Sequence, residues 1–155
     1  MRQLPLGVRL REAARFESYV AGPNAEAVTA LERAAALGAR RVVWLWGRAG
    51  TGKTHLLQSA CARVGERGGT AAWFYTQATD APLQPGFLDG AEQLELVAVD
   101  GLESLLASSD WNAALFRLHT LLLEAGGSLV IATGAAPASL AFTLPDLRSL
   151  SLIHI

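Results

Sequence analysis

The sequence has one cysteine and no long apolar run. With Cys61 alone, no disulfide can form within the chain, which fits a reducing, cytoplasmic setting. No apolar run reaches the roughly 18–20 residues that a membrane-spanning helix needs. The N-terminal residues lack the apolar core of a signal peptide. We therefore expect a cytoplasmic protein without a membrane segment.

A surplus of charge of one sign is also lacking. The chain has 13 basic and 14 acidic residues and a net charge of -1, and no basic stripe marks a nucleic-acid surface. Direct DNA binding by this chain alone is not expected. Its 155 residues predict one domain. Because 51% of residues are hydrophobic and only 17% charged, we expect a partner or further chain to cover part of the surface.

Short apolar runs alternate with stretches of helical periodicity. Strands are expected over 41–46, 70–75, 94–99 and 128–133, and helices over 25–37, 54–66 and 111–125, with a further helical turn near 87–88. Strands that alternate with helices pair in parallel, with helices on the sheet faces. The sequence therefore predicts an α/β fold.

A glycine-rich segment follows the first expected strand. Residues 47–54 (GRAGTGKT) match G-x-x-x-x-G-K-[ST] and lead into an expected helix, a context that argues against a chance turn. Such a loop points backbone N–H groups at phosphates. Lys53 is expected to reach the β- and γ-phosphates, and Thr54 to ligate Mg²⁺. The candidate nucleotide-binding residues are Gly47, Arg48, Ala49, Gly50, Thr51, Gly52, Lys53, Thr54 and His55.

Polar residues end two further strands. Asp100 follows an apolar run, as a Mg²⁺-binding acid would, although an aspartate capping a turn has the same pattern. The next position, where an ATPase of this type usually has a second acid, is Gly101. Glu103 is the nearest replacement, and a solvated acid at a helix start is an equal alternative. Thr133 is a candidate contact to the γ-phosphate or attacking water, or else part of a turn.

Residues 47–62 (GRAGTGKTHLLQSACA) resemble the P-loop and following helix of the DnaA family of AAA+ proteins. The Ala-Cys-Ala at 60–62, the Gly-Leu-Glu after Asp100 and the LPDLRS at 144–149 are similar to the Hda branch, which inactivates the replication initiator DnaA. The resemblance runs from about residue 3 to 149. It implies a three-layer α/β/α AAA+ fold, bound ADP or ATP with Mg²⁺, and DnaA as a partner. Without a second acid, weak or no intrinsic ATPase activity is expected.

The resemblance also gives meaning to the N-terminal residues. Gln3-Leu4-Pro5-Leu6 is similar to the motif by which Hda docks on the DNA polymerase sliding clamp, so Gln3, Leu4 and Leu6 are candidate partner-binding residues. Residues 16–24 are similar to a segment near adenine, with plain packing an equal alternative. The arginine that this branch offers to DnaA would follow Ser149. Leu150 stands there instead, and Arg148 is out of register.

The end of the chain does not resemble the family. Residues 150–155 (LSLIHI) look like a translated transposon end, so we expect a non-native tail there, after an N-terminal tail over 1–22 and an incomplete nucleotide-binding core over 23–149. A complete AAA+ unit continues with a last strand and a helical lid. The core would then be truncated before both, and the strand at 41–46 would be a sheet edge. Residues 150–155 could pair on that edge.

Three functions therefore remain open. The first is an Hda-like regulator that promotes ATP hydrolysis on DnaA when bound to the clamp. The second is a DnaA-family initiator ATPase or helicase-loader ATPase. The third is an unrelated P-loop enzyme, in which a small-molecule site would replace the clamp motif.

Overall fold

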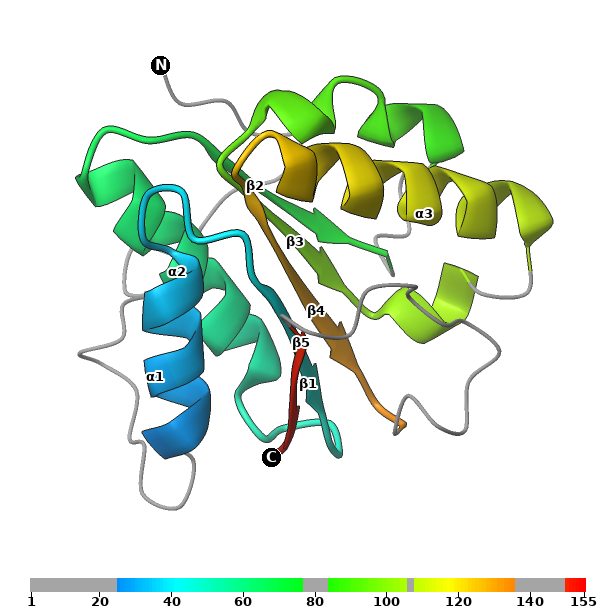
Figure 1. Cartoon of the computed structure of the whole chain (residues 1–155). Coiled ribbons are helices and arrows are strands. Elements are labelled where there is room, and N and C mark those ends of the chain that lie inside the picture. Colours follow the sequence, from blue (N-terminus) through cyan, green and yellow to red (C-terminus); the bar gives the residue numbers. More distant parts are fainter. Residues whose placement is uncertain (1–24, 77–83, 106–107, 136–149) are drawn as a thin grey trace.

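A parallel five-stranded sheet forms the centre of the protein (Figure 1). The computed structural model describes residues 25–76, 84–105, 108–135 and 150–155. The strands lie in the order β2-β3-β4-β1-β5. Their bounds are β1 Val42–Trp46, β2 Ala71–Tyr75, β3 Leu96–Asp100, β4 Ser128–Thr133 and β5 Leu150–His154.

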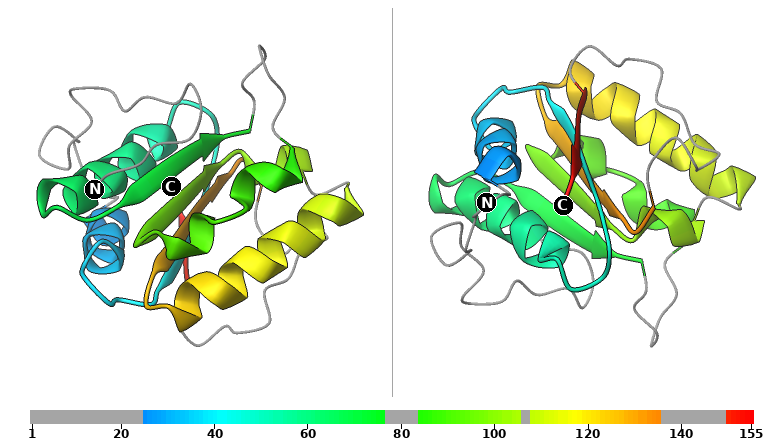
Figure 2. Two further views of the ribbon diagram at one scale, coloured as in Figure 1. Left: turned by 90° about the horizontal axis from the view of Figure 1, so that it is seen from above. Right: turned by 90° about the horizontal axis from the view of Figure 1, so that it is seen from below.

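Helices cover both faces of the sheet (Figure 2). One face carries α1 (Ala25–Ala34) and α2 (Lys53–Glu66), and the other carries α3 (Ser109–Glu124). Short 3-10 helices complete the layers: η3 Pro85–Leu88, η4 Ala91–Gln93 and η5 Leu102–Leu105. No helix in the described ranges is long and apolar enough to cross a membrane. The predicted α/β layering is confirmed, and the predicted strand and helix bounds differ from the observed ones by at most three residues.

Strand alternation divides the core into two clusters. On β1, Val43 and Leu45 pack toward α1 and α2, whereas Val42 and Trp44 pack toward α3. Successive side chains of a strand point to opposite faces. A sheet covered on both faces therefore needs a continuous apolar run, and VVWLW supplies it.

The sheet edge differs from the expectation. The sequence predicts that β1 lies at the edge, but β5 pairs with β1 in parallel, from Val42↔Leu150 to Trp46↔His154. Ile153 joins the core cluster beneath α1 and α2, and the rings of Trp46 and His154 stack with centroids 3.8 Å apart. The apolar LSLIHI segment thus fills the last-strand position, which corrects the predicted unpaired edge and confirms the alternative that residues 150–155 pair there.

Candidate functional site

The loop between β1 and α2 turns at two glycines. Gly50 and Gly52 have φ of +84° and +93°, a left-handed conformation that strains other residues. Gly52 is also the N-cap of α2, so no side chain caps this helix, and its first turn has no acidic residue. The start of α2 therefore suits an anion, which the positive end of the helix dipole attracts.

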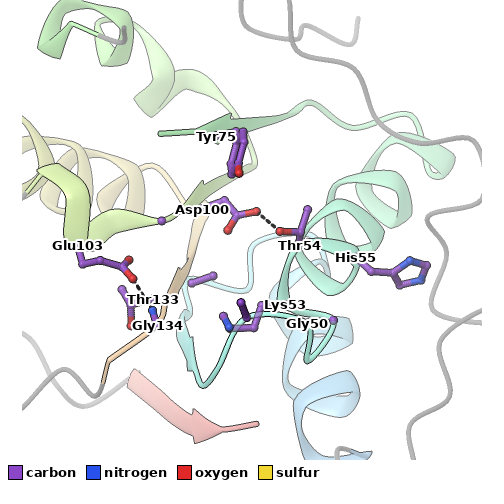
Figure 3. Close-up of a pocket in the computed structure, with 13 residues that line it drawn as sticks. Gly50, Lys53, Thr54, His55, Tyr75, Asp100, Glu103, Thr133 and Gly134 are labelled. Carbon is purple, nitrogen blue, oxygen red and sulfur yellow. Dashed lines mark hydrogen bonds between the residues drawn. The ribbon is translucent and has the colours of Figure 1, made fainter. Parts of the chain in front are cut away.

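Lys53 folds back over this loop. Its Nζ donates hydrogen bonds to the carbonyl oxygens of Gly47 and Arg48, at 2.6 and 2.7 Å. Figure 3 shows the ammonium group in the pocket beside the loop. Burial lowers the pKa of Lys53, while the charges of Asp100 and Glu103 act in the opposite direction. A phosphate here would add negative charge beside a partly desolvated ammonium group and favour its charged form.

The N-terminus of α2 also meets the end of β3. The hydroxyl of Thr54 donates to Asp100 Oδ2 at 2.6 Å (Figure 3). The Asp100 side chain is buried, which raises its pKa, although hydrogen bonds from Thr54 and Trp73 and the charge of Lys53 lower it. Both partners present oxygen atoms, the ligands that Mg²⁺ prefers. The residues present therefore fit a magnesium ion.

Two aromatic residues of β2 extend this group. Trp73 Nε1 donates to Asp100 Oδ2 at 3.2 Å. The Trp73 and Tyr75 rings lie nearly parallel, at an interplanar angle of 9° and a centroid distance of 5.6 Å, and Tyr75 lines the pocket. Neither role could be predicted from the sequence, because an aromatic residue in an apolar strand is first explained by packing.

Glu103 lies in η5, directly beside the end of β4. Its Oε2 accepts a hydrogen bond from the backbone N–H of Gly134 at 2.6 Å (Figure 3). The backbone N–H of Gly101 donates to Ala132 O at 2.9 Å, which holds the end of β3 against β4. Glu103 lines the same pocket as Asp100, so the residue predicted to replace the missing acid is near the site. Its catalytic role stays a prediction.

Thr133 ends β4 in the same pocket. Its hydroxyl accepts a hydrogen bond from Trp44 Nε1 at 2.9 Å and donates one to Ala135 O at 2.6 Å. The only hydroxyl proton is thus committed within the protein. In this arrangement Thr133 has no proton left for a phosphate oxygen, and its remaining lone pair can only accept a hydrogen bond from a water.

The other predicted loop residues are less central. His55 lines the pocket, but its ring points away from the other labelled side chains in Figure 3. Ala49 belongs to the pocket wall, whereas Arg48 is exposed and outside it. Thr51 Oγ1 donates to Arg48 O at 2.9 Å and so stabilises the loop itself.

Lys53, Thr54, Asp100, Glu103 and Thr133 line one pocket of about 440 Å³ at the carboxyl end of the sheet. In Figure 3, Lys53 lies on one side of it, and Asp100 and Glu103 lie on the other. The described ranges contain no group of three or more His, Cys, Asp or Glu residues placed to hold a metal. A Mg²⁺ ion typically takes one or two carboxylates and completes its shell with phosphate and water. The arrangement suits a polyphosphate with its cation.

Cys61 is separate from this site. It is buried on α2, and its Sγ lies 3.6 Å from Ala72 O. Burial raises the pKa of the thiol to about 12. A thiol that stays protonated at neutral pH is unreactive, so Cys61 contributes to the core through packing.

Several predicted residues lie outside the described ranges. They are the candidate clamp-binding residues Gln3, Leu4 and Leu6, the segment 16–24, and the segment 144–149 with Arg148.

No model of a known protein family matches the sequence, but solved structures do match. Domain III of the Thermotoga maritima replication initiation protein DnaA is 22% identical, with a TM-score of 0.76, over 96% of this chain and 69% of that one. The replication initiator DnaA bound to AMPPCP and single-stranded DNA is 22% identical, with a TM-score of 0.74, over 96% and 51%. DnaI is 14% identical, with a TM-score of 0.71, over 99% and 94%.

At these identities the likeness shows the fold alone, which is a parallel five-stranded sheet with helices on both faces, as in the DnaA structures. The predicted fold class is thereby confirmed. The chain spans about half the length of the DnaA structure that contains single-stranded DNA.

Proposed function

We propose that the chain binds ADP or ATP with Mg²⁺ and regulates replication initiation as a DnaA-like AAA+ protein. The observation that carries the proposal is the meeting of three groups in one pocket. The uncapped N-terminus of α2, Lys53 and the Thr54–Asp100 pair all face it. The first two suit phosphate and the third suits the cation. When bound, Mg²⁺ would neutralise phosphate charge, and Thr54 and Asp100 would hold it.

The Hda-like part of the proposal has its support in the sequence. The resemblance of residues 47–62 and 144–149, and the Gly101 that follows Asp100, favour a regulator over a self-sufficient ATPase. In this proposal the clamp binds Gln3, Leu4 and Leu6, and the clamp-bound chain promotes ATP hydrolysis on DnaA. Pulldown with the sliding clamp tests it: replacing Gln3 and Leu4 with alanine should abolish retention. Equal retention of the variant would reject the clamp motif.

A helicase-loader ATPase is the second candidate. The likeness to DnaI favours it, because the two chains match over 99% and 94% of their lengths, whereas the match spans 51% of the DnaA chain with bound DNA. The pulldown separates the two. Retention by the clamp supports the regulator, and retention by a replicative helicase supports the loader.

Nucleotide binding is tested with Lys53→Ala and a fluorescent ADP analogue. Removing a charged donor from a phosphate contact costs about 1.5–3 kcal/mol, or roughly a 10- to 150-fold weaker affinity. Arg48→Ala is the matched control, because it removes a positive charge from the same loop but from outside the pocket wall. Equal affinity of the Lys53→Ala variant and the parent would refute the proposed function.

A further inference from the structure

The Asp100 carboxylate accepts a hydrogen bond from a residue that is not part of the phosphate-loop motif. The indole Nε1 of Trp73, on β2, donates to Asp100 Oδ2 at 3.2 Å, and Thr54 donates to the same oxygen at 2.6 Å. The two donors come from the strand beside β3 and from the helix that follows the loop. Together they fix the rotation of the carboxylate, and neither bond uses Oδ1.

We propose that Trp73 is a positioning residue that orients Asp100 for the cation of a bound nucleotide. The inference rests on the proposed function, because it assigns a partner to the proposed magnesium-binding carboxylate. Trp73 itself does not line the pocket. It acts through Asp100, as the outer hydrogen-bond partners of metal ligands do, and the loss of such a partner typically costs about 10- to 100-fold in metal affinity.

An indole is well suited to this task. It is a donor only, so it can contact the Asp100 carboxylate in one way, with its N–H directed at a carboxylate oxygen. The rigid ring fixes the direction of that N–H, and the hydrogen bond therefore sets the orientation of the carboxylate.

The ring is also fixed in place. Trp73 is 9% exposed and belongs to the core cluster under α1 and α2. Its ring also stacks on the nearly parallel ring of Tyr75. In the β2–β3 register, Tyr75 is opposite Asp100 and Trp73 is opposite Ala98. Trp73 therefore lies opposite a position two residues before Asp100, and its indole extends in the strand direction to reach the carboxylate.

Packing alone is the competing explanation, and a phenylalanine separates the two. Trp73→Phe keeps an aromatic ring in the core and loses only the N–H donor and part of the ring. Trp44→Phe is a matched control. Trp44 is also buried in the sheet, and its Nε1 donates to Thr133 Oγ1 at 2.9 Å instead of to Asp100.

The experiment measures binding of a fluorescent ADP analogue by the full chain, in EDTA and over a magnesium titration. We expect Trp73→Phe to raise the magnesium concentration at half-saturation by about 10-fold or more and to leave the affinity in EDTA unchanged. Trp44→Phe should not move the magnesium midpoint. An unchanged midpoint in Trp73→Phe, or equal changes in both variants, would overturn the inference.

A parent chain that binds no nucleotide in either condition would instead overturn the proposed function, and with it the magnesium part of this inference. The hydrogen bond is then still decided in the ligand-free chain by nuclear magnetic resonance. Asp100→Ala should shift the indole N–H resonance of Trp73 much more than that of Trp44. Equal shifts of both indoles would show that Trp73 does not hold Asp100.

Discussion

The hydroxyl of Thr54 donates its proton to Asp100 and thereby joins the start of α2 to the end of β3, at an Oγ1–Oδ2 distance of 2.6 Å. A hydroxyl has one proton and two lone pairs. Donation to the carboxylate thus leaves lone pairs that can face a cation. The bond also orders both oxygens before any ligand arrives, so a cation would meet a site that is already assembled.

Thr54→Val tests this pair. The substitution removes the hydroxyl and keeps the side-chain shape, and we expect magnesium-dependent nucleotide affinity to fall by roughly 10- to 150-fold, the equivalent of about 1.5–3 kcal/mol. Thr54→Ser should keep most of the affinity because it keeps the hydroxyl. Titration of a fluorescent ADP analogue with and without EDTA measures both. Full magnesium dependence in Thr54→Val would contradict the assignment.

Asp100→Asn should change how stability depends on pH. Burial raises the pKa of Asp100 above its ordinary value of 3.8, so the folded chain binds this proton more readily than the unfolded chain does. The stability from this group is complete below the unfolded pKa and is lost as pH rises through the folded pKa. An asparagine does not titrate, so the Asp100→Asn variant does not lose this stability as the pH rises.

We therefore expect Asp100→Asn to be more stable than the parent at neutral pH without magnesium. Its advantage should shrink as the pH falls toward 3.8. Urea unfolding in EDTA at several pH values measures the difference. A constant difference across this range would contradict the raised pKa.

The contact between Glu103 and Gly134 should contribute to stability. A hydrogen bond from a backbone N–H to a carboxylate is worth about 1.5–3 kcal/mol, so Glu103→Ala should lower the free energy of unfolding by an amount of that order. A Cβ at Gly134 would lie 2.9 Å from Glu103 Oε2. Gly134→Ala should therefore displace the flexible end of the Glu103 side chain, cost the parent at most this hydrogen bond, and have little effect in the Glu103→Ala background. Additive effects in this double-mutant cycle would argue against the contact.

Thr133→Val should destabilise the fold through Trp44. The valine fills the space of the threonine but removes the hydroxyl oxygen that accepts the hydrogen bond from the indole N–H of Trp44 at 2.9 Å. A buried hydrogen bond contributes about 0.5–1.5 kcal/mol, and each kcal/mol lowers Tm by roughly 2–4 °C for a chain of this size. Thr133→Ser restores the acceptor and should unfold near the parent Tm. An equal Tm for valine and parent would exclude the bond.

The sequence was sufficient for the features that depend on short stretches of chain. The loop at 47–54 carries its own geometry, because glycine freedom, the lysine and the helix start all lie within eight residues. The apolar VVWLW run predicts a strand covered on both faces, and the amphipathic 111–125 segment predicts a surface helix. Each of these signals lies within a short stretch of sequence and does not depend on contacts with other parts of the chain.

Contacts between distant strands could not be predicted in the same way. Trp73 and Trp44 reach Asp100 and Thr133 because of strand order and register, which no local pattern encodes. The pairing of β5 depends on whether an apolar strand fits an open edge beside β1. The sequence offered that possibility without deciding it.

The strand order has a further consequence for how the site is assembled. Strand β4 lies between β1, which leads into the loop, and β3, which ends at Asp100, so the ends of β1 and β3 are about two strand spacings, or about 10 Å, apart. Helix α2 crosses this interval, because Thr54 near its start donates a hydrogen bond to Asp100. The helix start that suits phosphate and the carboxylate that suits the cation are therefore in contact, although the strands that lead to them are not neighbours.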